Sequence, residues 1–479
     1  MIKVQNYIDG KFCEAQNGKT LDIVEPATGN IFGTMPDSGS EDVDRAVQAG
    51  KRAFKEWKNI SGEKRMDYLM KIAEGIERHF EEFAKMESQD TGKPLSLARK
   101  VDIPRAIANF RFFAGAAWHF SSESHSMPEA VNFTLRQPLG VVGCISPWNL
   151  PIYLLSWKVA PALAAGNCVV AKPSEVTPCT AWLLARVCDE AGLPHGVLNI
   201  VHGVGNEAGR SLVEHPDIKA ISFTGGTATG KQIAAAAAPM FKKLSLELGG
   251  KNPTIVFADC DLDSTVDEVI RASFTNQGEI CLCGSRIFIE EKIFEQFKEA
   301  FIYKTRQLKV GDPLENDTHI GAIVSAQHQQ KILHYIQLGA QEGGRILFGG
   351  KKINVIGRCA SGYFIEPTVF EGLSPECRTM QEEIFGPVVT LTPFTNEQEA
   401  IELANNCSYG LSCSIWTKNL QRAMYMANHI EAGVVWINCW LLRDLRTPFG
   451  GVKQSGVGRE GGWEAMRFFT ETKNVCMKY

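Results

Sequence analysis

Short apolar runs alternate with helix-like segments between residues 139 and 248, and this alternation constrains the fold more than any other feature of the chain. Strands that recur about every 20 to 30 residues, with helices between them, predict a parallel, doubly wound sheet. Ligands of such sheets bind at the carboxyl ends of the strands. The expected strands are Leu139–Ser146, Asn167–Ala171, Val197–Val201, Lys219–Phe223 and Lys243–Leu248.

A second alternation begins after Asn252 and predicts a second α/β domain. Its expected strands are Thr254–Phe257, Ser285–Ile289, Val388–Pro393, Cys413–Trp416 and Val434–Asn438, and its expected helices are Phe294–Leu308, Ala326–Glu342, Asn396–Asn405 and Leu420–Ile430. Near the N-terminus, apolar residues at three- and four-residue steps predict further helices, one of them starting at Pro104. On that helix Arg105 is expected opposite the apolar stripe and free to reach outward.

The composition limits the classes of function. A chain of 479 residues predicts two to three domains, and a formal net charge of −4 does not favour nucleic acid as a partner. The 14 cysteines include no Cys-x-x-Cys pair, and with no apolar leader they predict reduced thiols in a cytoplasmic protein. The longest apolar stretch, around Ile152–Ala165, is short and contains Lys158 and Pro161, so no membrane span is expected.

A cysteine in a polar, glycine-containing turn is the sharpest chemical feature. The segment Phe274-Thr275-Asn276-Gln277-Gly278-Glu279-Ile280-Cys281 follows a predicted helix. Taken alone, Cys281 would more often be a small core residue than a nucleophile. Three other motifs accompany it: Ser146-Pro147-Trp148-Asn149, Glu247-Leu248-Gly249-Gly250-Lys251-Asn252-Pro253 and Gln381-Glu382-Glu383-Ile384-Phe385-Gly386-Pro387.

Together these four motifs resemble the aldehyde dehydrogenase superfamily, in order and from the Asp9-Gly10 turn to Phe449-Gly450-Gly451. The resemblance implies an α/β fold with a Rossmann-like NAD-binding domain, a second α/β catalytic domain and a β-arm for oligomerisation. It implies residues 1–119 and 139–249 for the first domain, 250–450 for the second, and 120–138 with 465–479 for the arm. The implied activity is NAD-dependent oxidation of an aldehyde to a carboxylic acid.

The resemblance also implies roles for three catalytic residues. Cys281 would add to the aldehyde carbonyl and carry a thiohemiacetal and then a thioester. The resulting oxyanion needs aimed donors, which the Asn149 amide and the Cys281 N–H would supply. Glu247 would be the general base for hydrolysis of the thioester. Without the motifs, Glu247 would be a surface carboxylate and Asn149 a helix N-cap.

The cofactor expected from the resemblance is NAD, and no metal site is expected. A glycine-rich turn, Phe223 to Gly230, follows a strand and opens a helix, where the backbone can approach a pyrophosphate. Lys172 and Glu175 resemble ligands of the adenosine ribose, and Glu383 and Phe385 resemble residues that hold the nicotinamide ribose and ring. The full expected set is Ile145, Pro147, Trp148, Lys172, Ser174, Glu175, Gly205, Phe223, Thr224, Gly225, Gly226, Leu248, Gly249, Glu383 and Phe385.

Glu279 and Cys283 lie two residues before and after Cys281. Glu279 stands where the family usually has Gln, and a carboxylate facing the thiol would raise the pKa of Cys281. Glu279 is therefore expected to point away or to be paired. Cys283 lies two residues after Cys281; a metal site there is disfavoured because no further ligand pair is near, and a regulatory disulfide would be strained.

The loop Asn438–Phe449 most resembles the branch of the family that acts on muconic semialdehydes, as do Asp102–Arg105 and Asn276–Cys283. The segment Asn276–Cys283 leans towards 2-aminomuconate 6-semialdehyde. Such substrates carry a distal carboxylate, which arginine binds bidentately, and Arg105 and Arg443 are the matched candidates. Alternatives are a 2-hydroxymuconate semialdehyde dehydrogenase, a general, betaine-type or retinal-type enzyme, a CoA-acylating enzyme, and a catalytically idle structural or binding protein. The alternative for the two arginines is that both are solvated surface residues. A homodimer or homotetramer is expected.

Overall fold

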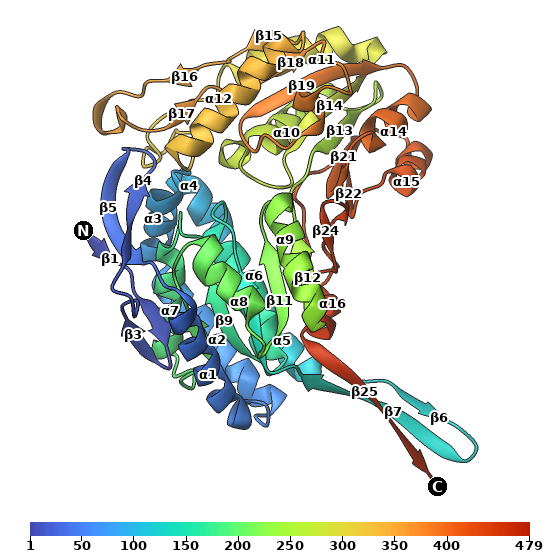
Figure 1. Cartoon of the computed structure of the whole chain (residues 1–479). Helices are drawn as coiled ribbons and strands as arrows, with labels where there is room; N and C mark the ends of the chain where they lie inside the picture. Colours follow the sequence, from blue (N-terminus) through green and yellow to red (C-terminus); the bar gives the residue numbers. More distant parts are fainter.

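The computed structural model describes all 479 residues, and two large β-sheets organise it (Figure 1). The first sheet has the order β24-β12-β11-β8-β9-β10-β2-β3, and its five central strands run parallel. These five are the strands that the alternation predicts, so the doubly wound sheet is confirmed. Their bounds are β8 Val141–Ile145, β9 Cys168–Lys172, β10 Leu198–Ile200, β11 Ile218–Thr224 and β12 Lys243–Glu247.

The edges of the first sheet come from distant parts of the chain. The hairpin of β2 (Asn6–Ile8) and β3 (Lys11–Cys13) pairs antiparallel with β10, and β24 (Gly456–Val457) pairs antiparallel with β12. The sequence analysis did not predict these three strands. A separate small sheet beside them consists of β1 (Ile2–Lys3), β5 (Asn30–Pro36) and β4 (Thr20–Glu25).

Helix α6 (Pro151–Ala164) lies at the centre of this half of the molecule, and all of its residues are buried. A helix that is apolar nearly all round must be covered on every side, and α2 and α5 pack beside it. The surrounding helices are α1 Ser40–Trp57, α2 Gly62–Arg78, α3 Phe80–Thr91, α4 Leu95–Leu97, the π-helix η1 Ala98–Asp102, α5 Ile103–His119, α7 Cys179–Glu190, α8 Arg210–Glu214 and α9 Thr227–Ala237.

The second sheet has the order β15-β18-β19-β14-β13-β21-β22 and is parallel except for its edge strand β15. All five strands expected after Asn252 are present, and β15 and β18 are additions. The strands are β13 Asn252–Val256, β14 Gly284–Glu290, β15 Arg345–Phe348, β18 Thr368–Glu371, β19 Val388–Phe394, β21 Ser412–Trp416 and β22 Val434–Ile437; the helices are α10 Leu262–Phe274, α11 Phe294–Thr305, α12 Ala326–Gln341, α13 Arg378–Gln381, α14 Glu397–Asn405 and α15 Leu420–His429.

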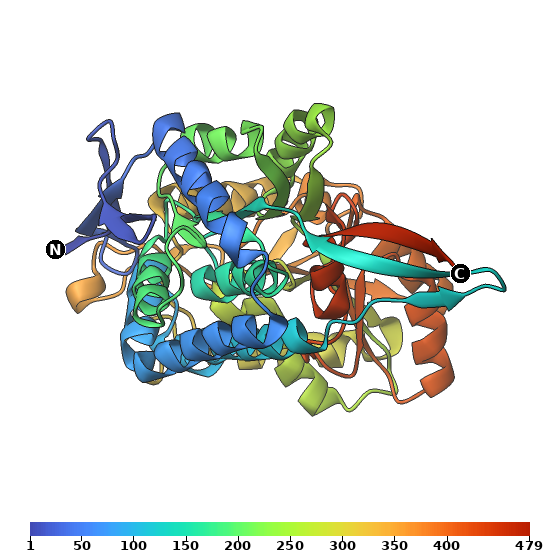
Figure 2. The ribbon, with the colours of Figure 1, turned by 90° about the horizontal axis from the view of Figure 1, so that it is seen from below.

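A three-stranded arm projects from the body of the molecule (Figures 1 and 2). Strand β25 (Thr470–Lys478) pairs antiparallel with β7 (Ala130–Pro138), which pairs with β6 (Ser124–Ser126). These strands fall within residues 120–138 and 465–479, the two segments expected to form an arm. The first residues of the second segment belong instead to helix α16 (Gly462–Phe468), and β25 begins after that helix, at Thr470. No helix of the chain is long and apolar enough to span a membrane.

Candidate active site

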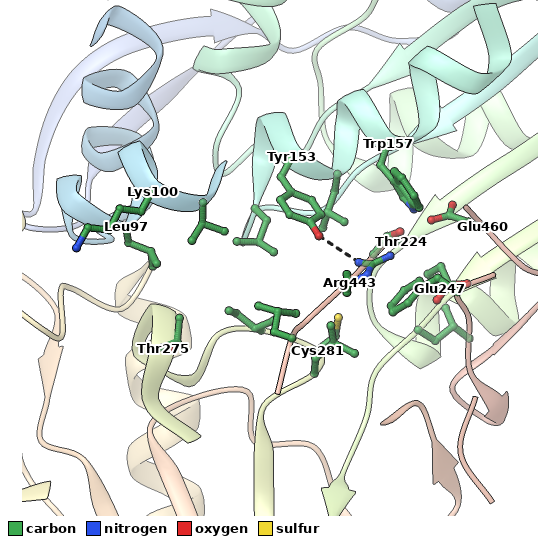
Figure 3. A pocket seen from close by; sticks show the side chains of 18 of the residues that line it. Leu97, Lys100, Tyr153, Trp157, Thr224, Glu247, Thr275, Cys281, Arg443 and Glu460 are labelled. Carbon is green, nitrogen blue, oxygen red and sulfur yellow. Dashed lines mark hydrogen bonds between the residues drawn. The ribbon is translucent and has the colours of Figure 1, made fainter. Parts of the chain in front are cut away.

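A cavity of about 190 Å³ lies where the two halves of the molecule meet, and Cys281 and Glu247 both line it (Figure 3). Its walls come from α6, from the ends of β11 and β12, from the segment between α10 and β14, and from the loop before Phe449. Residues distant in sequence thus converge on one mostly apolar space, as in typical small-molecule sites.

The segment between α10 and β14 brings Cys281 to the cavity through a sharp reversal. Asn276, Gln277 and Gly278 all have positive φ values of 54°, 56° and 71°. Glycine is needed at 278 for space as well, since a Cβ there would lie 2.3 Å from the Gly386 carbonyl oxygen. The Asn276 Nδ2 donates to the backbone oxygens of Asn149 (3.3 Å) and Glu279 (3.2 Å). The reversal is therefore held from both sides.

The surroundings of Cys281 favour the neutral thiol. Burial raises the pKa of the Cys281 thiol, and the carboxylates of Glu383 and Glu247 raise it further, while Arg443 opposes them. The thiol therefore holds its proton before a substrate enters, and it needs a general base to become a nucleophile. The thiol is the only sulfur among the cavity-lining residues.

Asn149 faces the same loop across a long sequence separation. Its Nδ2 donates to the Glu279 carbonyl at 2.8 Å, and its side chain is buried. An amide nitrogen carries two hydrogens, so a second N–H is left for another acceptor. The alternative that Asn149 caps a helix is wrong, because the N-cap of α6 is Leu150 and no side-chain capping bond forms there.

Glu247 ends β12 and is 4% exposed, so the surface-carboxylate alternative is wrong as well. Neither carboxylate oxygen has a hydrogen-bond partner. Burial raises its pKa well above the ordinary value, and the charge of Glu460 adds to that rise. A buried carboxylate with a raised pKa is suited to act as a general base.

Sequence reasoning missed an ion pair behind Glu247. The Lys158 Nζ lies 2.6 Å from Glu460 Oε1, and the Ser222 hydroxyl donates to the same oxygen at 3.0 Å. Lys158 and Glu460 are separated by 302 residues and both are buried. The only signal in the sequence was a lysine inside an otherwise apolar helix, which rarely stays buried without a partner.

Glu279 and Cys283, the two positions beside the nucleophile, both form hydrogen bonds to the backbone. The Glu279 Oε1 accepts a hydrogen bond from the Val324 N–H at 3.2 Å, so the expectation of a paired carboxyl is confirmed. Burial raises its pKa well above the ordinary value. Cys281 and Cys283 are free thiols, and Cys283 donates to the Thr275 carbonyl at 3.9 Å.

The expected cofactor residues gather at the carboxyl ends of the first sheet. Lys172 ends β9, and its Nζ bonds Glu175 Oε2 at 2.8 Å; the Gly205 N–H lies 3.4 Å from Glu175 Oε1. Burial would raise the pKa of Glu175, but Lys172 outweighs it and holds the pKa below the ordinary value. At the same ends lie Ile145, Pro147 and Trp148 after β8, Ser174 after β9, Phe223, Thr224, Gly225 and Gly226 at β11, and Leu248 and Gly249 after β12.

The residues expected around a nicotinamide come from the second half of the molecule. The Glu383 Oε1 accepts from the Gly250 N–H at 2.8 Å, and a Cβ at Gly249 would lie 2.3 Å from Glu383. Phe385, with a φ of 62°, meets the Trp148 ring edge-on at 5.2 Å. The sequence analysis missed His328, whose pKa burial lowers to about 4 and whose Nε2 lies 2.6 Å from the Phe385 carbonyl.

These surroundings fit a dinucleotide. A Cβ at Gly226 would meet nothing within 4 Å, so the backbone at the start of α9 is open to a ligand, and helix N-termini favour phosphates. Glu175 would accept hydrogen bonds at one end of such a ligand, and Glu383 would accept them at the other end.

Arg443 and Arg105 both lie against the ring of Trp157. The guanidinium of Arg443 lies 3.9 Å from the Phe449 ring centroid and 5.3 Å from that of Trp157, and that of Arg105 lies 5.2 Å from Trp157 and from Tyr153. Neither arginine forms an ion pair. Arg443 lines the cavity, whereas Arg105 stands behind its wall. The expectation that Arg105 reaches outward is wrong, because it turns inward onto these rings.

Comparison with known proteins decides the family. The model of the aldehyde dehydrogenase family matches residues 12–475. The chain belongs to the aldehyde dehydrogenase family. A 2-aminomuconic semialdehyde dehydrogenase from Danio rerio is 48% identical, and the match covers 100% of this chain and 99% of the relative. A 2-hydroxymuconic semialdehyde dehydrogenase from Pseudomonas sp. (strain CF600) is 45% identical, with 100% of both chains covered.

Solved aldehyde dehydrogenases share the fold. A betaine aldehyde dehydrogenase from Staphylococcus aureus, solved in complex with NAD+, has a TM-score of 0.96 and 38% identity, with 99% of this chain and 94% of that chain covered. An indole-3-acetaldehyde dehydrogenase from P. syringae, solved with NAD+, has a TM-score of 0.97 and 37% identity, with 100% and 97% covered. The aldehyde dehydrogenase fold expected from the sequence is confirmed.

Proposed function

We propose that this aldehyde dehydrogenase oxidises 2-aminomuconate 6-semialdehyde to 2-aminomuconate with NAD. The observation that carries the substrate class is the pair of arginines without carboxylate partners beside the cavity of Cys281. Full-length relatives that bear the aminomuconic name support the choice. The hydroxymuconic semialdehyde is the second candidate, since relatives of that name are nearly as similar. A cationic betaine-type aldehyde is disfavoured, because two guanidinium groups would repel it.

The proposed reaction runs through two covalent states of Cys281. The Cys281 sulfur attacks the aldehyde carbon as its thiol proton passes to Glu383 or Glu247, the two carboxylates that act on its pKa, and the new oxyanion accepts hydrogen bonds from the Asn149 Nδ2–H and the Cys281 N–H. NAD, which Lys172, Glu175 and Glu383 would help to hold, would supply the hydride acceptor, and loss of hydride from the carbon would leave the thioester on Cys281. Glu247 then removes a proton from water as the water attacks, and Cys281 leaves as the acid forms.

The surroundings of Glu247 suit this last step. Its pKa is raised, so the carboxylate is a stronger base than an exposed glutamate would be. Its two free oxygens can hold a water molecule, since no protein donor competes for them. We propose that Glu460, which is paired with Lys158, receives the proton afterwards, because Glu460 lines the same cavity as Glu247 and acts on its pKa.

The substrate proposal predicts a selective loss when either arginine is removed. We expect Arg443→Ala and Arg105→Ala each to lower kcat/KM for the muconic semialdehyde by about 10- to 100-fold relative to hexanal. Hydrogen bonds to a charged group contribute roughly 1.5–3 kcal/mol each, and about 1.4 kcal/mol is tenfold in rate. Steady-state NADH absorbance with both aldehydes gives the ratio of the two efficiencies.

For Arg443→Ala, the ratio of kcat/KM for the muconic semialdehyde to kcat/KM for hexanal is more informative than either value alone. Arg443 also lowers the pKa of Cys281, so its removal should slow hexanal somewhat, and this shared part cancels in the ratio. Arg446→Ala is the matched control, because Arg446 lies in the same loop but is exposed and paired with Asp444. Equal losses for both aldehydes in both arginine variants would mean that the arginines are structural.

Glu175 sets the expected choice of cofactor. We propose that its carboxylate accepts hydrogen bonds from the adenosine ribose hydroxyls and repels a 2′-phosphate, so that NAD is preferred over NADP. Its depressed pKa keeps it ionised at neutral pH. Glu175→Gln should narrow the preference by raising the efficiency with NADP. Equal kcat/KM for the two cofactors in the wild type would contradict the assignment.

We propose that the arm pairs between subunits and that the protein is a homodimer or homotetramer. Strand β25 ends the arm sheet with one edge unpaired, and its side chains are mostly exposed. Unpaired strand edges favour pairing with another chain. Light scattering at micromolar concentration should give a mass of two or four chains of 52.8 kDa. A single-chain mass would refute this proposal without touching the catalytic one.

A further inference from the structure

We infer that Tyr153 is a third residue that recognises the substrate carboxylate, through a hydrogen bond from its hydroxyl. The inference rests on the proposed function, which assigns the carboxylate to Arg105 and Arg443. It adds an uncharged donor to two charged ones, on a helix that sequence reasoning treated only as apolar.

The hydroxyl of Tyr153 has a spare hydrogen. The Arg443 Nη1 lies 3.1 Å from Tyr153 Oη, as the dashed line in Figure 3 shows. A guanidinium can only donate, so the tyrosine oxygen is the acceptor in this bond and keeps its own O–H. No protein group accepts that hydrogen, although Tyr153 is only 7% exposed and lines the cavity.

The backbone of Tyr153 is fixed, which keeps the ring in place. Its carbonyl accepts from Asn109 Nδ2 at 3.2 Å and from the Ser156 hydroxyl at 2.9 Å. Asn109 also accepts from Arg105 Nε at 3.1 Å, and the Arg105 guanidinium lies 5.2 Å from the Tyr153 ring centroid. Tyr153 thus contacts both arginines, one through its hydroxyl and one through its ring.

Unused donors therefore meet beside the cavity. Besides the Tyr153 O–H, Arg443 lines the cavity and bonds Tyr153 through Nη1 alone. Behind the cavity wall, the buried Nη2 of Arg105 has no hydrogen-bond partner either. A carboxylate offers about four acceptor sites and could take several of these bonds at once. A methyl group could take none of them, and a neutral ester would form weaker bonds because it carries no charge, so the hydroxyl would favour aldehydes that end in a carboxylate over neutral ones of the same length.

The test is Tyr153→Phe, which removes the hydroxyl and keeps the ring under Arg105. We expect KM for the muconic semialdehyde to rise about tenfold with kcat nearly unchanged, because a contact made equally in ground and transition states affects KM alone. The ratio of kcat/KM for the muconic semialdehyde to kcat/KM for hexanal should fall by about the same factor, because any shift of Arg443 acts on Cys281 with both aldehydes and cancels in the ratio. Tyr425→Phe, in which the tyrosine lies on the exposed helix α15, is the control and should change neither substrate.

The outcomes separate this inference from the proposed function. If the wild type prefers the muconic semialdehyde and Tyr153→Phe keeps the full preference, the hydroxyl does not recognise the carboxylate and the inference is overturned. An equal loss with both aldehydes would assign Tyr153 a structural role and also overturn it. If the wild type itself shows no preference over hexanal, the proposed substrate class fails first, whatever the variant does.

Discussion

Cys281→Ala should abolish NADH formation, lowering turnover by roughly 10⁴-fold or more, as expected when a covalent nucleophile is removed. The sulfur is the only thiol in the cavity, so no neighbouring group can form the thiohemiacetal. NAD should still bind, because Cys281 is not among the proposed cofactor residues, most of which lie at the ends of β8, β9, β11 and β12. Quenching of tryptophan fluorescence on addition of NAD measures this binding, with Trp148 close to the expected nicotinamide.

Cys283→Ala is the matched control for the nucleophile. Cys283 is also buried and lies two residues away, but its thiol donates to the Thr275 carbonyl and does not line the cavity that Cys281 and Glu247 share. We expect turnover within a few-fold of the wild type. Near wild-type turnover in Cys281→Ala would show that the nucleophile has been assigned wrongly.

Glu247→Gln should separate the two half-reactions. Acylation and hydride transfer would still give about one NADH per active site in a rapid burst, after which hydrolysis of the thioester becomes rate-limiting. Loss of a general base typically costs about 10²- to 10⁴-fold. The thioester should then accumulate and appear in the intact-protein mass spectrum as the mass of the acyl group. Glu295→Gln, at an exposed glutamate that pairs with Lys298, should behave like the wild type.

The pH dependence adds a second signature. Glu247 acts as a base only when ionised, and burial together with Glu460 raises its pKa. In the wild type the rate of thioester hydrolysis should therefore increase with pH through that raised value. Glu247→Gln should lose this increase. Steady-state turnover in the variant that matches the wild type across the pH range would remove Glu247 from the mechanism.

The sequence predicted the parallel centre of both sheets because each strand there is an apolar run bounded by helices. It could not predict the edges. β24 has two residues and β2 has three, too few for any periodicity to register, and their partners lie about 190 to 210 residues away. Short edge strands are selected by the sheet that they join, and local propensity says little about them.

The candidate site shows the same division between local and tertiary information. Cys281, Glu247 and Asn149 could be named from motifs, and the structure brings Cys281 and Glu247 to one cavity, with Asn149 bonded to the loop that carries Cys281. The orientation of Arg105 could not be predicted from helical periodicity, because periodicity gives the direction of a side chain only relative to its own helix. The aromatic rings that Arg105 contacts lie on another helix, α6. The Lys158–Glu460 pair was hidden for a related reason: its partners are 302 residues apart.

The most direct test of the account is the stoichiometry of products from 2-aminomuconate 6-semialdehyde. Purified protein with NAD should form one NADH and one molecule of 2-aminomuconate for each aldehyde consumed, with a kcat/KM well above that for hexanal. NADH can be followed by absorbance and the acid by mass spectrometry. No NADH from the muconic semialdehyde, alongside efficient oxidation of hexanal, would contradict the substrate assignment; no NADH from either aldehyde would contradict the proposed activity.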